Sequence, residues 1–310
     1  MNLDDAVYNL EIYPRRKIDP SKYLDIKSWV AKAIAEEDQK PNSILWNGEP
    51  TEDDQIVERL RRIRLCRKHE KAYPSLKEVA DRLAACRKYN RCCSGACPEC
   101  GWLLQRWFVR KSKGFIADVI NKHDKHLVAI TIIPSQPIIA PRHLSKFSID
   151  DMQRRLKSAL GKIGFRAVVG GIDFSFNEDR GGKYQSFWCV HVYIITSIKN
   201  KGRIKRQLKK VYVSDDRIPR PIKISAFSNS ARRRSYAFKA IFFRRIGYDA
   251  VKSKNGIERK CRDTSHDRLR ARERLELFAY LDQCGLAQRL IFGAAKPVVS
   301  SSGVTIGKAK

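Results

Sequence analysis

The chain has 310 residues, of which 63 are Lys or Arg and 33 are Asp or Glu, so its formal net charge is +30. A positive excess of this size is typical of proteins that bind a polyanion such as nucleic acid. No apolar run approaches the roughly 18 residues that a membrane span needs, and the polar, acidic start of the chain does not resemble a signal peptide. We therefore expect a cytoplasmic protein without membrane contacts, in which disulfide bonds are rare.

Charge is unevenly distributed along the chain. Residues 1–60 hold 8 basic and 13 acidic residues, a net charge of −5, so the rest of the chain carries +35. The segment 199–245 alone holds 16 basic and 2 acidic residues. We therefore expect the segment 199–245, and not the acidic N-terminal segment, to form the nucleic-acid surface. The first 80 residues are predicted to form short helices, interrupted by prolines and glycines.

Five of the nine cysteines fall within residues 86–100, in a predicted zinc-binding segment at 81–112. Structural Zn²⁺ sites take four ligands, usually in closely spaced pairs, and Cys97 and Cys100 form such a pair. Cys86 with either Cys92 or Cys93 can supply the second pair, at a spacing longer than usual. The alternative is a redox pair or a set of buried free thiols. The predicted ligands of one structural Zn²⁺ are Cys86, Cys92, Cys97 and Cys100.

Beyond the cysteines, hydrophobic periodicity and capping residues predict helices and strands in alternation. Ser148 and Asp151 form a capping-box pattern at the start of one helix, which is expected to end at Gly161 or Gly164. The predicted elements are helices at 101–120, 148–164, 232–246 and 266–285, and strands at 126–134, 166–176 and 186–196. This order is typical of an α+β fold.

The organisation predicted from this order has a core and two C-terminal parts. The core spans residues 113–250, with a central antiparallel sheet flanked by helices. Residues 251–295 are predicted to form a C-terminal helical region, and residues 296–310 a disordered tail, because they are small, polar and contain glycine.

The predicted strand 186–196 carries the first candidate site. Side chains alternate along a strand, so His191 and Tyr193 share one face, while the other face is wholly apolar and is assigned to the core. Asp173 interrupts the apolar pattern of the preceding strand. A carboxylate and an imidazole on adjacent strands can bind a hard divalent cation. The alternative is an ordinary hydrogen-bonded strand histidine and a carboxylate near a turn.

The predicted basic helix at 232–246 carries the second candidate site. Tyr236 and Lys239 stand at i and i+3, and Arg232 lies one turn earlier on the same face. A tyrosine hydroxyl can attack a phosphate that nearby cations polarise, and the product is a phosphotyrosine. The alternative is a basic amphipathic helix that only packs Tyr236. The predicted DNA contacts from this segment are Arg232, Arg233, Arg234, Arg244 and Arg245.

Taken in order, these motifs resemble the rolling-circle replication initiators of bacterial plasmids and phages, the HUH endonuclease class. The resemblance covers roughly residues 86–290 and rests on the cysteine knot, the strand Leu127–Pro134 with Thr131, the Gly-Gly-x-Asp segment, the His191 strand and the Tyr-x-x-Lys pair. It implies a central antiparallel sheet with helices on its faces. It also implies an enzyme that nicks one DNA strand at a single-stranded or hairpin origin.

The resemblance assigns roles to the candidate residues. Tyr236 would be the nucleophile and Lys239 the cation facing the phosphate, while His191 and Asp173 would bind Mg²⁺ or Mn²⁺. The family motif is His-hydrophobic-His, so Tyr193 stands where the second histidine is expected. Either two ligands and water suffice, or a further carboxylate helps, or catalysis is lost and DNA binding remains. The candidate further carboxylates are Glu178 and Asp179.

Three other readings stay open. The first is a degenerate, non-catalytic DNA-binding protein that acts as a repressor or marks an origin. The second is a transposase or relaxase, which shares the chemistry and differs in its DNA site. The third is an RNA-binding protein with a zinc knuckle.

Overall fold

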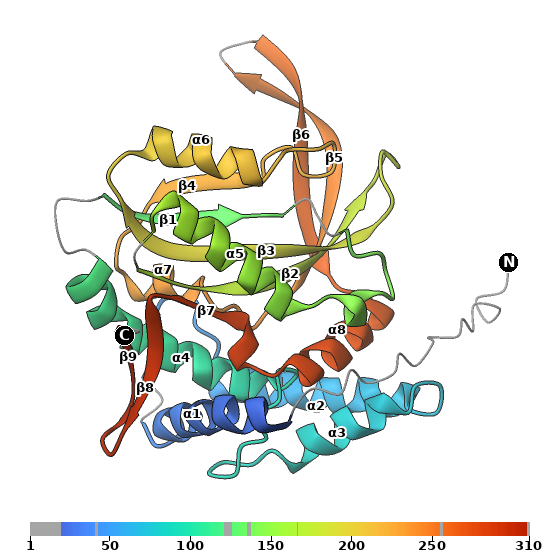
Figure 1. Ribbon diagram of the computed structural model, residues 1–310. Helices are drawn as coiled ribbons and strands as arrows, with labels where there is room; N and C mark the ends of the chain where they lie inside the picture. Colours follow the sequence, from blue (N-terminus) through green and yellow to red (C-terminus); the bar gives the residue numbers. More distant parts are fainter. Residues whose placement is uncertain are drawn as a thin grey trace, which may run out of the picture.

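The computed structural model describes residues 20–40, 43–120, 126–134, 138–165, 167–254 and 257–308, and it shows an α+β fold (Figure 1). Its helices are α1 (Pro20–Asp38), α2 (Glu52–His69), α3 (Ser75–Ala85), α4 (Pro98–Phe115), α5 (Ile149–Ile163), α6 (Lys201–Val211), α7 (Ala231–Ser235) and α8 (Ala271–Cys284). Its strands are β1 (His126–Ile132), β2 (Val168–Asp179), β3 (Phe187–Ile198), β4 (Ile222–Ala226), β5 (Phe243–Lys254), β6 (Ile257–Arg268), β7 (Leu290–Gly293), β8 (Ala295–Ser300) and β9 (Gly303–Lys308).

The central sheet has the strand order β4-β1-β3-β2-β5-β6, and β7 also pairs with β2. Most pairs are antiparallel, as the sequence predicts, but β2 and β5 are parallel. The chain passes through α6, β4 and α7 between β3 and β5, which gives the long connection that a parallel pair requires. The α+β prediction is therefore confirmed, while the sheet is mixed and not wholly antiparallel.

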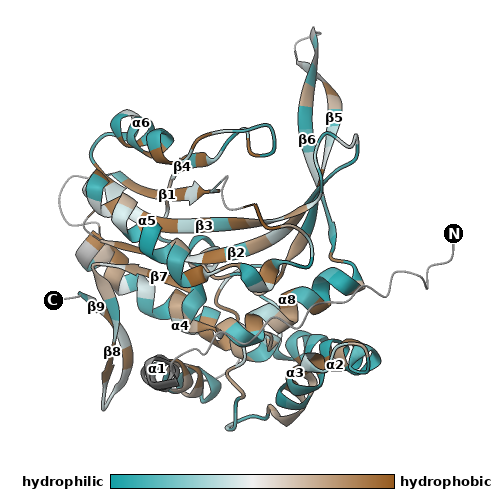
Figure 2. Ribbon diagram, turned by 45° about the vertical axis from the view of Figure 1, so that its right-hand side comes forward, coloured by the Kyte–Doolittle hydropathy of each residue, from teal (hydrophilic) through white to brown (hydrophobic). Residues whose placement is uncertain are grey.

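Helices cover both faces of the sheet, and each face has its own core. Trp188, Val190 and Val192 of β3 pack with α5 and α6 in one core. Ile195 and Tyr193, on the other face of the same strand, pack with α4 and with the chain that follows α7. The apolar colouring of β1 and β3 in Figure 2 reflects this burial. Both faces of β3 are thus covered, although only one was assigned to the core from the sequence.

Local sequence explains where several helices begin and end. The Ser148 side chain accepts a hydrogen bond from the backbone N–H of Asp151, which starts α5. Gly164 ends the same helix in the left-handed conformation, with φ 88°, so the helix stops at the later of the two expected glycines. Thr51 and Asp54 form a reciprocal capping box at the start of α2. The N-terminal segment is helical as predicted, in the part from Pro20 onward that the structure describes.

Three predictions about the C-terminal half are wrong. The basic helix expected at 232–246 ends at Ser235, because the chain from Phe243 enters the sheet between β2 and β6. The helical region expected at 251–295 begins with strand, since β5 and β6 pair over twelve residues each and α8 starts only at Ala271. The tail expected to be disordered forms the β8–β9 hairpin, up to Lys308. In this hairpin Val304 is fully buried, and its carbonyl accepts a hydrogen bond from Trp107 Nε1.

Candidate functional site

The cysteine knot is the first candidate site. Four of its sulfur atoms lie within 4.8 Å of one another, and they belong to the four residues chosen from the sequence, Cys86, Cys92, Cys97 and Cys100. Three of the sulfur–sulfur distances are 3.7 Å: Cys86 to Cys100, Cys92 to Cys100, and Cys97 to Cys86. A tetrahedron with Zn–S bonds of about 2.3 Å has edges of about 3.8 Å. The four thiols therefore fit one tetrahedral metal ion such as Zn²⁺.

The choice between Cys92 and Cys93 is made by the backbone. Cys93 has a positive φ of 52°, and its sulfur is not among the four that lie within 4.8 Å of one another. Its sulfur instead lies 3.6 Å from the backbone carbonyl oxygen of Arg91. Adjacent cysteines rarely both face one ion, so Cys92 is the ligand that the chain geometry selects.

Buried ion pairs join the knot to the N-terminal helices. The Arg91 guanidinium contacts Asp38 at the end of α1, with Nη2 2.6 Å from Oδ1, and also pairs with Glu99 at the start of α4. Glu99 pairs in addition with Arg59 of α2. The side chains of Arg91, Asp38 and Glu99 are all nearly inaccessible to solvent. This ion-pair network holds α1, α2 and α4 around the metal site.

Replacing Arg91 by Ala is expected to lower the free energy of unfolding by about 3–5 kcal/mol, because the buried Asp38 loses its cation and Glu99 keeps only Arg59. Urea unfolding of the metal-loaded protein measures the change. Replacing the neighbouring, exposed Lys88 by Ala is the control and should have little effect. Equal stability of the two variants would show that the network does not stabilise the fold.

The second candidate site lies on the sheet face toward α7. Asp173 of β2 and His191 of β3 are directly opposite each other in the antiparallel register. Directly opposite residues project to the same side of a sheet, so Asp173 and His191 leave neighbouring strands on the same face. The sequence prediction that the two residues converge therefore matches the register of the structure.

His191 is held as a neutral imidazole. Its side chain is almost completely buried, and this burial lowers its pKa well below the usual range, with Arg245 and Lys239 acting in the same direction. His191 Nε2 lies 2.8 Å from Ser175 Oγ, and Ser175 in turn donates to Asn177 Oδ1. The neutral form is the one that can bind a metal ion or accept a proton.

Tyr236 and Lys239 follow α7 in the segment that leads to β5. They do not lie on a common helix, yet the Lys239 ammonium is 4.8 Å from the centre of the Tyr236 ring. The same ammonium lies 3.4 Å from Asp173 Oδ2. The Tyr236 ring is 51% exposed and its centre is 6.2 Å from that of Tyr193. The structure thus brings the predicted residues of this site together. It does so through a loop after α7, where the sequence had predicted a helix. The residues are Asp173, His191, Tyr193, Tyr236 and Lys239.

Tyr193 differs from the histidine that the resemblance expects. Burial raises the pKa of Tyr193 to about 12, so its phenol stays protonated at neutral pH. A neutral phenol is a weak metal ligand, and its ring packs against the α4 core. The two further carboxylates considered from the sequence are also engaged: Glu178 pairs with Arg270, and Asp179 pairs with Arg262.

The five arginines predicted to contact DNA divide into two groups. Arg232 and Arg233 are exposed on α7, and Arg245 lies partly buried near His191. Arg234 is buried, and its guanidinium donates to the Val109 carbonyl and to Asn229. Arg244 of β5 forms ion pairs with Asp267 of β6 and with Glu178 of β2. Arg234 and Arg244 therefore serve the fold in this structure.

Sequence reasoning missed the residues that hold the loop. Arg289 is fully buried and donates from Nε to the Ile172 carbonyl at 3.2 Å and from Nη2 to the Lys239 carbonyl at 2.5 Å. Burial lowers its pKa to about 10, and the nearby Asp173 opposes the shift. The only signal was one arginine within the apolar run that leads into β7.

Gly171 allows the loop to approach the sheet. A Cβ at this position would overlap the backbone carbonyl of Ala237, next to Tyr236. Replacing Gly171 by Ala is therefore expected to displace Tyr236 and to reduce any reaction at its hydroxyl by about 100-fold, the usual effect of a misplacement of about 1 Å. Gly161→Ala on α5 is the matched control, since its Cβ meets open space. Equal rates for the two variants would exclude this role for Gly171.

The second site offers two protein ligands for a divalent cation. Among the described residues, the knot is the only group of three or more His, Cys, Asp or Glu side chains with metal-ligand geometry. Mg²⁺ is often bound by only one or two protein ligands, and water and substrate phosphate complete its coordination. Asp173 and His191 fit that arrangement, although Asp173 is already paired with Lys239.

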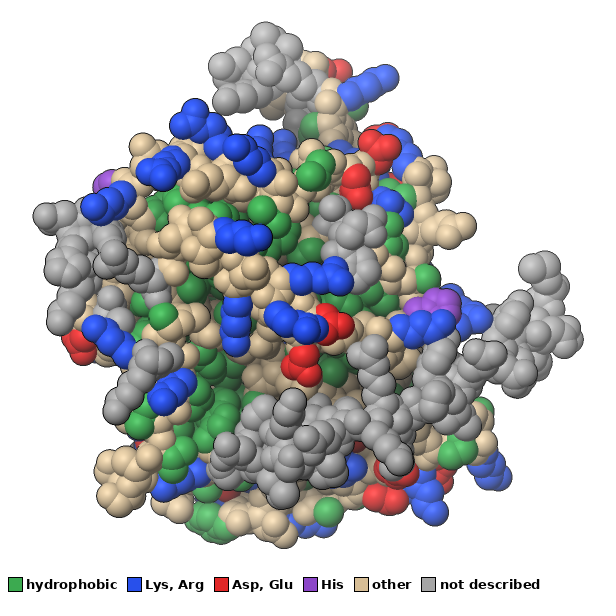
Figure 3. All heavy atoms as spheres, viewed as in Figure 1, with side chains coloured by type: hydrophobic (Ala, Val, Ile, Leu, Met, Phe, Trp, Pro, Cys, Tyr) green, Lys and Arg blue, Asp and Glu red, His purple; other side chains and the backbone are tan. Residues whose placement is uncertain are grey.

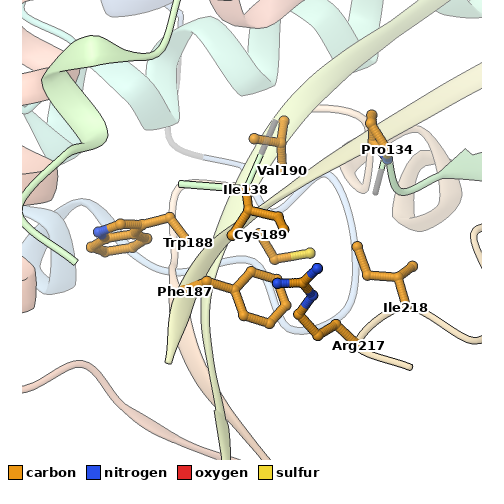
Figure 4. A pocket seen from close by; sticks show the side chains of 8 residues that line it. All are labelled: Pro134, Ile138, Phe187, Trp188, Cys189, Val190, Arg217 and Ile218. Carbon is orange, nitrogen blue, oxygen red and sulfur yellow. The ribbon is translucent and has the colours of Figure 1, made fainter. Parts of the chain in front are cut away.

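Enclosed space near the sheet is small. The cavity beside Cys189 and Arg217 has a volume of about 10 Å³, and Figure 4 shows the side chains around it. A cavity of this size holds about one water molecule. This cavity therefore has no room for a nucleotide. In the part of the chain described here, no helix is long and apolar enough to cross a membrane.

The fold and the two sites define an α+β protein with a four-cysteine cluster and an exposed tyrosine beside a Lys–Asp–His group on a basic sheet face. Comparison with protein-family models, with curated proteins and with solved structures finds no match to this chain. Its function must therefore be argued from the sites.

Proposed function

We propose that this protein is a DNA-binding replication initiator that nicks one DNA strand through a phosphotyrosine intermediate at Tyr236. The observation that supports the proposal most is the juxtaposition of Tyr236, Lys239 and the Asp173–His191 pair. The positive charge of the chain and the exposed Arg232 and Arg233 beside the tyrosine favour a nucleic-acid substrate.

The proposed reaction exchanges one phosphate ester for another. Tyr236 Oη forms a bond to phosphorus, one P–O bond of the DNA backbone breaks, and the released deoxyribose oxygen takes up a proton. Lys239 faces the developing negative charge on the phosphate, and the tyrosine proton passes to solvent water. A phosphotyrosine conserves the energy of the ester, so that the strand can be rejoined later.

A divalent cation is part of this proposal. His191 and Asp173 would hold Mg²⁺ or Mn²⁺, which would supply Lewis-acid polarisation of the scissile phosphate. Zn²⁺ in the cysteine knot would have a structural role only, because four cysteines would fill its four coordination sites and leave none for substrate.

The test is formation of a covalent adduct. The purified protein is incubated with Mn²⁺ and a labelled pool of randomised single-stranded DNA hairpins, then denatured and separated on a gel. Labelled DNA that migrates with the denatured protein supports the proposal, and its loss in EDTA shows the metal requirement. An adduct that forms with RNA hairpins instead would favour the RNA-binding alternative.

A second candidate function is a DNA-binding protein without catalysis. Two observations favour it: Tyr193 is neutral where a metal-binding histidine is expected, and Lys239 occupies the carboxylate of Asp173. Absence of any adduct with Mg²⁺ or Mn²⁺, together with retained DNA binding, would select this alternative. A transposase or relaxase would give the same adduct, and a preference for one DNA site would distinguish it.

A further inference from the structure

The basic segment 199–245 forms two surfaces that lie on opposite faces of the sheet. α7 and Tyr236 lie on the face that packs against α4, since Ala237 and Phe238 belong to that core. Leu208 of α6 belongs to the core on the other face, together with α5. Figure 1 shows α5 and α6 lying together across one side of the sheet. α6 therefore cannot contact the same stretch of DNA phosphates as the Tyr236 site without the DNA passing around the sheet.

α6 has a continuous cationic surface. At 3.6 residues per turn its six basic residues occupy an arc of about 200°, while its buried and partly buried apolar residues point to the core. All six are exposed, and no carboxylate among the described residues pairs with any of them. They are Lys201, Arg203, Lys205, Arg206, Lys209 and Lys210. By contrast, Arg59, Arg91 and Arg106 near the cysteine knot and α4 are neutralised by ion pairs.

The same charge continues over α5. Arg155, Lys157 and Lys162 are exposed there and form no ion pair with a carboxylate of the described residues, whereas Arg154 pairs with Asp151. Figure 3 shows Lys and Arg side chains gathered over α6 and over the neighbouring α5, with acidic side chains at one end. We call the exposed basic residues of α5 and α6 the α5–α6 surface.

We propose that the α5–α6 surface binds the backbone of duplex DNA, as a second nucleic-acid site separate from the Tyr236 site. An 11-residue helix is about 16 Å long, and duplex DNA presents about one phosphate per 1.7 Å of its axis. Six cations on α6 therefore face a comparable number of phosphate charges. This inference rests on the proposed function for the identity of the polyanion.

Two features favour duplex DNA over the alternatives. Single strands are bound by exposed aromatic rings on which bases stack, and such a ring lies at the Tyr236 site, where Tyr236 is 51% exposed and its ring centre is 6.2 Å from that of Tyr193. Neither α5 nor α6 contains an aromatic residue. A membrane-surface helix inserts its apolar side into lipid, but in α6 Leu208 and Ile204 pack in the core and only Val211 is exposed.

The test compares two variants with equal changes of charge. In the first, Arg203, Arg206 and Lys210 are replaced by Gln, and these residues stand at i, i+3 and i+7 on α6. In the control, Arg61, Arg64 and Lys68 are replaced by Gln; they are exposed at the same spacing on α2. The probes are a 20-base-pair duplex and a short oligo-dT strand, and binding is measured as a function of salt concentration.

The α6 variant is expected to lower the slope of log affinity against log salt for the duplex by about 2–3, at about 0.9 for each lost phosphate contact. Its affinity for oligo-dT should be unchanged, and so should its adduct yield on a hairpin. An unchanged duplex slope, or an equal decrease in the α2 control, would overturn the proposal. The proposal would also be overturned if the α6 variant lost binding to phosphatidylserine vesicles while the salt slope of its duplex affinity stayed the same. Because duplex binding is measured without nicking, a wild-type protein that gives no adduct contradicts only the proposed function.

Discussion

Replacing Tyr236 by Phe is expected to abolish the covalent protein–DNA adduct while leaving DNA binding almost unchanged. The substitution removes one hydroxyl from a ring that is half exposed, so it neither opens a cavity nor removes a buried hydrogen bond. The Lys239 ammonium can still lie over the aromatic ring. Denaturing gel electrophoresis after incubation with Mn²⁺ and hairpin DNA measures the adduct.

Other tyrosines provide the controls for this result. Tyr89→Phe is the matched control, because Tyr89 is 74% exposed but lies in the cysteine knot. Tyr280 is buried, and its hydroxyl donates to the Phe147 carbonyl, so it cannot reach DNA. If Tyr236→Phe still formed the adduct, the nucleophile would have to be another residue, and Tyr248 would be tested next.

Two neighbouring substitutions separate chemistry from binding. His191→Ala should suppress the adduct and leave salt-dependent DNA binding nearly intact, since His191 is buried and its ring contacts Ser175. Tyr193→His introduces a second imidazole two residues from His191 on the same strand face and should raise the affinity for Mn²⁺. Unchanged Mn²⁺ affinity in both variants would show that this strand does not bind the metal.

Replacing Cys97 or Cys100 by Ser is expected to release the zinc ion and to unfold the N-terminal helices. Structural Zn²⁺ contributes about 10–16 kcal/mol in small zinc domains, which is comparable to the whole stability of a typical domain, about 5–15 kcal/mol. In this protein the knot also fixes Arg91, whose ion pairs join α1 and α4. Loss of the metal should therefore be seen as loss of helical circular dichroism and of solubility.

Elemental analysis of the purified protein measures the metal directly, with about one Zn²⁺ per chain expected. Cys93→Ser is the matched control, because the Cys93 sulfur is directed to the Arg91 carbonyl and not to the other thiols. A wild-type protein without zinc would contradict the assignment. If Cys97→Ser kept its zinc and Cys93→Ser lost it, Cys93 would be the zinc ligand and Cys97 would not.

The elements that were predicted correctly are those with local signals. Apolar, β-branched runs give β1 and β3, and capping residues give both ends of α5. The helix expected at 232–246 failed because its sequence, rich in Arg and Phe, suits either a helix or a strand. The decision there is made by pairing of β5 with β2 and β6, which lie far away in the sequence.

The sequence predicted the residues of the candidate site, but it did not predict the residues that hold them in place. Residue types and spacing indicated Asp173, His191 and Tyr236, but their meeting depends on the β2–β3 register and on the close approach that Gly171 permits. The buried Arg289, which ties the Tyr236 loop to β2, carries no local signal of that role. Likewise, whether a basic residue binds DNA or stabilises the fold depends on its neighbours, as Arg233 and Arg234 show.

The hairpin of β8 and β9 has a consequence for biosynthesis. It lies against α1, where Lys32 Nζ donates to the Ser300 carbonyl at 2.6 Å and the backbone N–H of Val304 donates to Glu36. Val304 also covers Trp107 of α4. The helical layer made first by the ribosome therefore lacks part of its core until residues 295–308 have been translated. During most of synthesis Trp107 can contact Trp29 of α1 but lacks the cover of Val304, so this layer exposes apolar surface that a chaperone would bind on the growing chain.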